Sequence, residues 1–198
     1  VFARSGSSWS QQAYVKASNT GVGDNFGAAL ALDTAGDTLA VGAPYEASNA
    51  TAQSDNSAAN AGAAYLFARS GSTWSQQAYV KASNTATNDN FASALALNSD
   101  GSTLAVGAIG ESSSATGING DQADNSKDGV GAVYLFNRSG AAWTQQTYVK
   151  PSTSTLGNEF GTAIGLSADG STLAISGAFE QSNATGIGGA QTDTSATD

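Results

Sequence analysis

The stretch DNFGAALALDTAGDTLAVGAP, residues 24–44, contains two short apolar runs separated by a turn that carries two aspartates. In the first run, Phe26, Leu30 and Leu32 alternate with glycine and alanine, which is the two-residue period of a β-strand. Because small apolar residues occupy the other face as well, we expect a sheet that is covered on both sides. The stretch therefore predicts two neighbouring strands, at residues 26–32 and 38–43.

The chain consists of three copies of one unit. Residues 2–20 and 67–85 differ at a single position, and a looser third copy begins at Phe136. Repetition at this period is typical of solenoids, propellers and other arrays. The repeats occupy approximately residues 1–66, 67–135 and 136–198 of a single segment, 1–198.

Each unit contains four short segments rich in β-branched, aromatic and small residues, and none has a helical period. In the first copy, completed by the start of the second, these segments are residues 26–32, 38–43, 63–69 and 74–82. The first two contain mainly small or aliphatic residues, whereas the last two carry large aromatic rings. This increase in bulk favours sheets arranged around an axis, so we predict an all-β fold, a β-propeller made of four-stranded antiparallel blades. The main alternative is a β-solenoid, whose turns are usually much shorter.

Two motifs resemble the FG-GAP repeat of integrin alpha-chain propellers and of large bacterial surface proteins. FG at residues 26–27 followed by GAP at 42–44 has the motif's full form, and GAVYLF at 131–136 is similar to its third strand. The bacterial type is the more similar, judging by WSQQAYVKAS and GINGDQADNS. The resemblance implies a seven-bladed propeller, mostly extracellular, that serves adhesion or binding and holds calcium in some blades.

The predicted strand order divides the chain into about three blade-equivalents, two whole blades flanked by two half blades. Closed propellers use four to eight blades, so the terminal sheets would have unpaired edges. Because the chain begins with Val1, we expect it to be an excerpt of a longer array. The alternative is that the half blades pair between subunits and form a ring or an open filament.

Composition excludes several functional classes. The chain has 198 residues, 24 glycines, a formal charge of -9 and no cysteine, methionine or histidine. The negative charge disfavours nucleic acid and anionic membrane surfaces, and no apolar run is long enough for membrane insertion. Without histidine and cysteine, the usual activated nucleophiles and histidine-ligated zinc are excluded.

Acidic loops are the candidate metal sites. The short turns, such as DTAGDT at residues 33–38, offer too few oxygen atoms for calcium, so we predict ordinary turns there. The loop GINGDQADNSKDG at 117–129 has enough oxygen for one calcium ion, the only cofactor we expect. A solvated loop with Asx turns is the alternative. The candidate ligands are Asn119, Asp121, Asp124 and Asp128.

Two further sets of residues recur at the strand ends. Acidic or amide residues precede the first strand and follow the second, where we expect them to accept hydrogen bonds from exposed backbone N–H groups; membership of a cation site is the alternative. Apolar residues next to the second set are candidates for binding a partner at a propeller rim, and packing against the neighbouring blade is the alternative. The first sets are Asp24, Asp89 and Asn158, and Glu46, Glu111 and Glu180; the rim residues are Tyr45, Ile109 and Phe179.

From the residues and the resemblance together we expect a non-enzymatic module, secreted or displayed at the cell surface. It would act in adhesion or as a scaffold and bind a protein or glycan partner through its blade loops. A self-assembling structural subunit joined by strand pairing between chains is the second hypothesis. A carbohydrate-active enzyme is the third, although no pair of carboxylates stands out for that chemistry.

Overall fold

The structure is a computed structural model that describes residues 1–49, 52–193 and 195–196. This part of the chain forms only β-strands, turns and loops, which confirms the predicted all-β class. The strands are β1 (Phe2–Ser5), β2 (Ser8–Gln11), β3 (Leu30–Leu32), β4 (Thr38–Ala43), β5 (Ala63–Ser70), β6 (Thr73–Val80), β7 (Phe91–Leu97), β8 (Thr103–Ala108), β9 (Ala132–Ser139), β10 (Ala142–Val149), β11 (Phe160–Leu166) and β12 (Leu173–Gly177).

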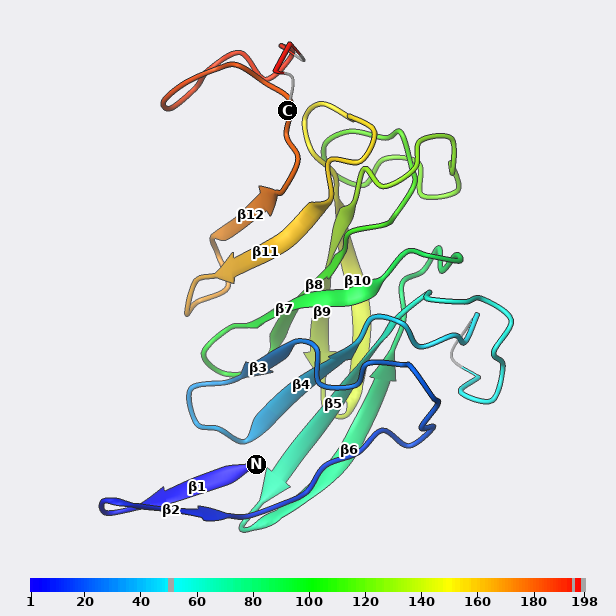
Figure 1. The fold of residues 1–198 in the computed structure, drawn as a ribbon. Helices are drawn as coiled ribbons and strands as arrows, with labels where there is room; N and C mark the ends of the chain where they lie inside the picture. The colour runs from blue at the N-terminus through cyan, green and yellow to red at the C-terminus, as the bar shows by residue number, and fades with distance from the viewer. Residues whose placement is uncertain (50–51, 194, 197–198) are drawn as a thin grey trace.

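The strands form two complete blades and two half-blades, as the sequence predicts (Figure 1). The first complete blade is the antiparallel sheet β3-β4-β5-β6, and the second is β7-β8-β9-β10. The first half-blade, β1-β2, corresponds to the two outer strands of a blade, and the last half-blade, β11-β12, corresponds to the two inner strands. Strands β3, β7 and β11 lie next to one another, so the sheets fan out like successive propeller blades.

The two faces of every blade differ. In the second complete blade, Phe91, Leu95 and Tyr134 belong to a face of large residues, which packs against small residues of the first complete blade such as Ala31 and Ala40. The same arrangement recurs where β11 and β12 meet the second complete blade. Each blade therefore stacks its large face on the small face of the blade before it.

Glycine permits this close stacking. A Cβ atom added at Gly42 would lie 2.2 Å from the carbonyl oxygen of Ala92, and one added at Gly107 would lie 2.4 Å from that of Gly161. The glycine of each GAP segment thus contacts the backbone of the next FG segment. In the third copy Ser176 occupies this position, on an exposed face.

The predicted strand at residues 26–32 is wrong in length, because β3 contains only Leu30–Leu32. In the later copies the strand extends back to the phenylalanine, and Phe91 makes a parallel bridge to Gly62 of the preceding connection. The position equivalent to Gly62 for Phe26 would precede Val1, so this bridge is missing from the described residues. In the pairing of β7 with β8, residues 92 and 93 form a bulge between Phe91 and Ala94. Because side chains alternate between the two faces of a strand, a bulge of two residues leaves Phe91 on the same face as Leu95.

Candidate functional site

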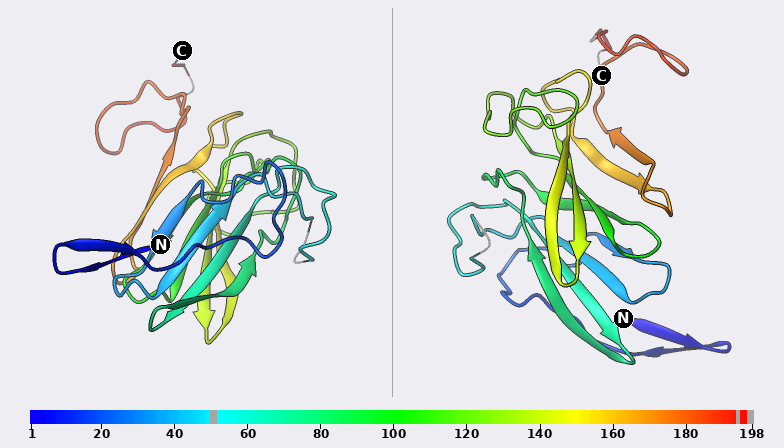
Figure 2. Two further views of the ribbon diagram at one scale, coloured as in Figure 1. Left: turned by 60° about the horizontal axis from the view of Figure 1, so that its bottom comes forward. Right: turned by 180° about the vertical axis from the view of Figure 1, so that it is seen from behind.

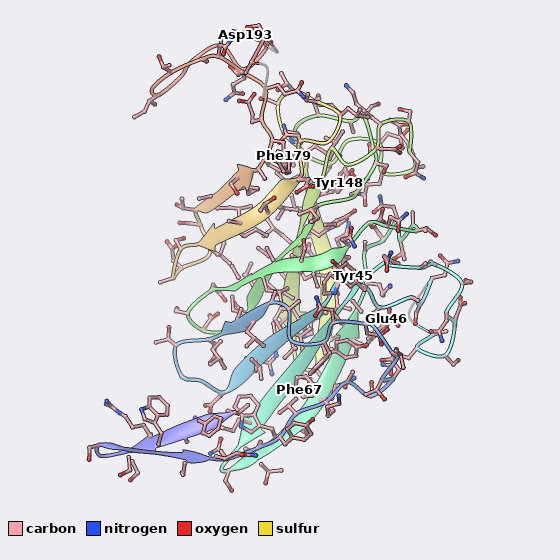
Figure 3. All side chains as sticks on the ribbon, in the orientation of Figure 1. Tyr45, Glu46, Phe67, Tyr148, Phe179 and Asp193 are labelled. Carbon is pink, nitrogen blue, oxygen red and sulfur yellow. The ribbon has the colours of Figure 1, made fainter. Side chains whose placement is uncertain are left out.

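Loops that follow the second strand of each blade contain the same Glu-x-Ser pattern. Glu46 and Glu111 are 1% and 0% exposed, and Figure 3 shows Glu46 just beyond β4. The Ser48 N–H donates to Glu46 Oε2 at 3.1 Å, and the Ser182 N–H donates to Glu180 Oε1 at 3.0 Å. Glu46 and Glu180 therefore accept backbone N–H groups, as predicted for these strand-end acids.

Each buried glutamate also forms an ion pair. Lys81 Nζ lies 3.2 Å from Glu46 Oε2, and Lys150 Nζ lies 2.6 Å from Glu111 Oε2. The lysines follow β6 and β10, so each pair joins the end of an inner strand to the outermost strand. Burial lowers the pKa of both lysines, while the neighbouring carboxylates oppose this shift. We call these the Glu46–Lys81 and Glu111–Lys150 centres.

Asparagine and tyrosine complete each centre. Asn84 donates from Nδ2 to Glu111 Oε1 at 3.0 Å and accepts the Tyr134 hydroxyl at 2.7 Å. In the first complete blade, Asn19 accepts the Tyr65 hydroxyl at 2.6 Å and donates to Glu46 at 2.9 Å. Because each asparagine lies in the connection that enters the blade, the centre ties this connection to both halves of the blade.

The arrangement of these centres is structural rather than chemically reactive. Burial favours the neutral form of Glu46, but the hydrogen bond from Ser48 and the charge of Lys81 outweigh it and lower the pKa of this carboxyl. Burial and the charge of Glu46 raise the pKa of Tyr65, so its hydroxyl stays protonated. The groups satisfy one another, and the centres serve to fix the loops that surround them.

Sequence reasoning missed the lysines of these centres. Lys16, Lys81 and Lys150 each follow Tyr-Val, and Lys81 and Lys150 come directly after strands that carry no charge. A single charge that recurs at one position of every copy, together with a recurring glutamate, is the signal that could have revealed the pairs.

Asp89, which precedes β7, is 1% exposed and accepts the Ala86 N–H at 2.7 Å. Asp24 accepts the Gly21 N–H in the same way, which confirms the predicted capping role for both. Burial raises the pKa of Asp89 to about 7, although the Ala86 N–H opposes it; the charge of Glu111 adds to the increase, while Lys81 and Lys150 reduce it.

Replacing Asp89 by asparagine, the residue at the equivalent Asn158, is expected to stabilise the protein at pH 8. Between about pH 4 and pH 7 the native carboxyl keeps a proton that the unfolded chain has lost, so stability falls as the pH rises through this window. Asp89→Asn should therefore add about 2–4 kcal/mol above pH 7 and little below pH 4. Urea unfolding across this range measures the difference. If Asp89→Asn changed the stability equally below pH 4 and above pH 7, the raised pKa of Asp89 would be contradicted.

Three of the four proposed calcium ligands accept backbone hydrogen bonds through their side chains. Asp121 Oδ1 accepts the Ala123 N–H, Asp124 Oδ2 accepts the Ser114 N–H, and Asn119 Oδ1 accepts the Tyr148 N–H of β10. The hydrogen bond from Ser114 lowers the pKa of Asp124. The backbone carbonyl of Asp128 accepts the Gly157 N–H. Across the described residues, no three acidic side chains are grouped as metal ligands would be, and calcium at this loop stays a prediction.

The short acidic turn has the predicted form. Asp33 Oδ1 accepts the Asp37 N–H at 2.8 Å, and Gly36 adopts a positive φ of 68° between them. Asp33 and Asp37 therefore shape the connection from β3 to β4.

The proposed partner-binding residues are not all equivalent. Tyr45 is 47% exposed and Phe179 is 52% exposed. Their backbone N–H groups donate to the backbone carbonyls of Asp24 and Asn158 respectively. In the second complete blade, the N–H group that donates to the backbone carbonyl of Asp89 belongs to Gly110 and not to Ile109. Ile109 is partly buried and lies one position earlier, where the first copy has Pro44. Tyr45 and Phe179 thus remain the two aromatic candidates at this edge (Figure 3).

Stacked four-stranded sheets, repeated along the chain with long loops fixed at one edge, define a repeat protein of the β-propeller blade type. Its sequence matches the FG-GAP repeat family over residues 9–67 and 74–136, so the chain belongs to this family. Repeats of this family generally form non-enzymatic binding or scaffold modules and are typical of extracellular and surface proteins. No curated protein matches the sequence. Within the described part of the chain, no helix is long and apolar enough to cross a membrane.

Proposed function

We propose that this FG-GAP segment is an extracellular adhesion or scaffold module that binds a protein or glycan partner through its loops. The observation that carries the proposal is the pair of buried Glu–Lys centres, which fix the loops after β4 and β8 at one edge of the blades. Exposed aromatic side chains held on a rigid support are the usual anchors of protein and sugar partners. Tyr45, directly after β4, has this placement, and Phe179 is the equivalent exposed aromatic residue after β12.

A screen of immobilised glycans and extracellular matrix proteins tests this proposal. Tyr45→Ser and Phe179→Ser should each weaken binding at least about tenfold, as expected for central aromatic anchors. Trp9→Ser is the matched control, because Trp9 is also exposed but lies within β2, where it pairs with Arg4 of β1. If all three variants bound the partner as tightly as the wild type, the edge with Tyr45 and Phe179 would be excluded as the binding surface.

Two measurements, each made with calcium and with a chelator, test the proposed calcium site at Asn119, Asp121, Asp124 and Asp128. They are the binding screen and the thermal melting of the protein. A bound structural ion would raise the melting midpoint in calcium by mass action. An unchanged midpoint and unchanged binding in chelator would remove calcium from the proposal.

A further inference from the structure

The Glu111–Lys150 centre holds an amine and a carboxamide on the two oxygens of one carboxylate. Lys150 Nζ donates to Glu111 Oε2 at 2.6 Å, and Asn84 Nδ2 donates to Glu111 Oε1 at 3.0 Å. The Glu111 and Lys150 side chains are both 0% exposed. An amine and a carboxamide can condense to a new amide with loss of ammonia, and a fixed position side by side favours this reaction strongly.

The side-chain carbonyl of Asn84 has a donor of its own. The Tyr134 hydroxyl donates to Asn84 Oδ1 at 2.7 Å, and Tyr134 is 0% exposed. Burial raises the pKa of Tyr134, so the hydroxyl keeps its proton. When an amine adds to a carboxamide carbon, negative charge develops on the carbonyl oxygen, and a hydrogen bond aimed at that oxygen stabilises it. Tyr134 therefore prepares Asn84 for attack.

The equivalent glutamate of the first complete blade is held in its charged form by further donors. The Ser48 N–H and the Tyr79 hydroxyl donate to Glu46 Oε2 at 3.1 and 2.9 Å, and the Ser48 hydroxyl donates to Oε1. Hydrogen bonds to a carboxylate favour its charged form. Lys81 therefore stays an ammonium group, which is not a nucleophile. For the same reason the ion-paired form of either centre is unreactive.

Glu111 lacks these further donors. The Ser113 hydroxyl donates to the Asp121 carbonyl at 2.7 Å instead, and the Tyr148 hydroxyl is buried without a hydrogen-bond partner. Burial lowers the pKa of Lys150, although the charge of Glu111 opposes this shift. Fewer hydrogen bonds thus oppose the transfer of a proton from Lys150 to Glu111, and the transfer removes two buried charges.

The second complete blade also offers an exit for the released ammonia. Asn84 lines a hollow of about 470 Å³ together with Ser83 and Gln122. Asn84 is partly buried and Ser83 is exposed, so the hollow connects the carboxamide with solvent. A small neutral product can leave on this side while Lys150 remains buried on the other.

We propose that Lys150 and Asn84 become joined by an isopeptide bond within the chain, with Glu111 as the group that moves the protons. Glu111 takes a proton from the ammonium group, and the neutral Nζ adds to Asn84 Cγ. The Cγ–Nδ2 bond then breaks, and Nδ2 leaves as ammonia with the proton from Glu111. Glu111 accepts the second proton from Nζ. The products are a neutral amide, ammonia and a protonated Glu111, so the buried ion pair disappears.

The bond would close a covalent loop from residue 84 to residue 150 around the second complete blade. The chain has no cysteine, so no disulfide can provide such a constraint. The right-hand view in Figure 2 shows the β9–β10 hairpin from behind, with the loop between β8 and β9 at the end where β10 finishes. Only the folded blade brings the three groups together, so freshly folded chain still contains the ion pair. The bond does not depend on the proposed adhesive function.

Mass spectrometry of the intact protein tests the bond. After prolonged incubation of the folded chain at neutral pH, the mass should be lower by one ammonia, and a proteolytic digest should contain a branched peptide that joins Lys150 to Asn84. Lys150→Arg keeps the positive charge beside Glu111, but a guanidinium group does not lose its proton, so this variant should retain the full mass. Lys81→Arg is the matched control in the first complete blade and should lose one ammonia as the wild type does.

Three results would overturn the proposal. They are a wild-type chain that keeps its full mass, a loss of ammonia that persists in Lys150→Arg, and a branched peptide that joins Lys81 to Asn19. The second result would indicate cyclisation of Asn84 onto its own backbone, which releases the same molecule. Urea unfolding shows whether both arginine variants are folded, and the branched peptide of the wild-type chain decides the outcome independently of them.

Discussion

Replacing Glu111 by alanine should lower the free energy of unfolding by about 3–5 kcal/mol. The Glu111 and Lys150 side chains are both 0% exposed, so removing the carboxylate leaves an ammonium group buried without its partner. The variant also removes the acceptor of the Asn84 amide, which in turn holds the Tyr134 hydroxyl. Urea unfolding at neutral pH, with the slope m compared between variants, measures the loss.

The third copy provides the matched control for this prediction. Glu180 is the equivalent glutamate, is exposed and has no lysine partner among the described residues, so Glu180→Ala should change stability by less than about 0.5 kcal/mol. The double variant Glu111→Leu with Lys150→Met should recover most of the loss, because it removes both buried charges. A loss below about 1 kcal/mol for Glu111→Ala would show that Lys150 reaches water.

Local residue patterns were sufficient to predict most of the fold. Alternation and turn residues predicted β4, β5 and the Ser-Gly hairpins, because these features depend on neighbours in the sequence. The start of β3 was predicted wrongly because it depends on a bridge from the preceding repeat unit, as Gly62 provides for Phe91. The strand ends therefore depend on blade stacking, which no single unit contains.

The candidate site was harder to predict than the fold. Lys81 and Glu46 are 35 residues apart and meet only after β4, β5 and β6 have paired. The number of oxygen atoms in residues 117–129 left two interpretations open, a calcium site, which stays a prediction, and a solvated loop with Asx turns; Asp121 and Asp124 each accept N–H groups of nearby residues. Counting polar atoms does not distinguish ligands that converge on an ion from side chains that cap their own turns.

Replacing Gly107 by alanine should lower the free energy of unfolding by about 3 kcal/mol. The added Cβ atom would lie 2.4 Å from the carbonyl oxygen of Gly161, so β8 and β11 would have to move apart and loosen the packing at Ile164. Urea unfolding measures the change.

Gly71→Ala separates this steric effect from the loss of glycine itself. Gly71 has a positive φ of 61° and open space around it, so alanine there should cost about 1 kcal/mol from backbone strain alone. Equal losses in the two variants would show that blades do not rely on glycine for their spacing. Ser176 already carries a side chain at the position equivalent to Gly107, and the fold accommodates it because this face of β12 is exposed. We therefore expect a side chain at this position to be harmful between two blades and tolerated on the exposed face of β12, because the neighbouring blade, and not its own strand, requires the GAP glycine.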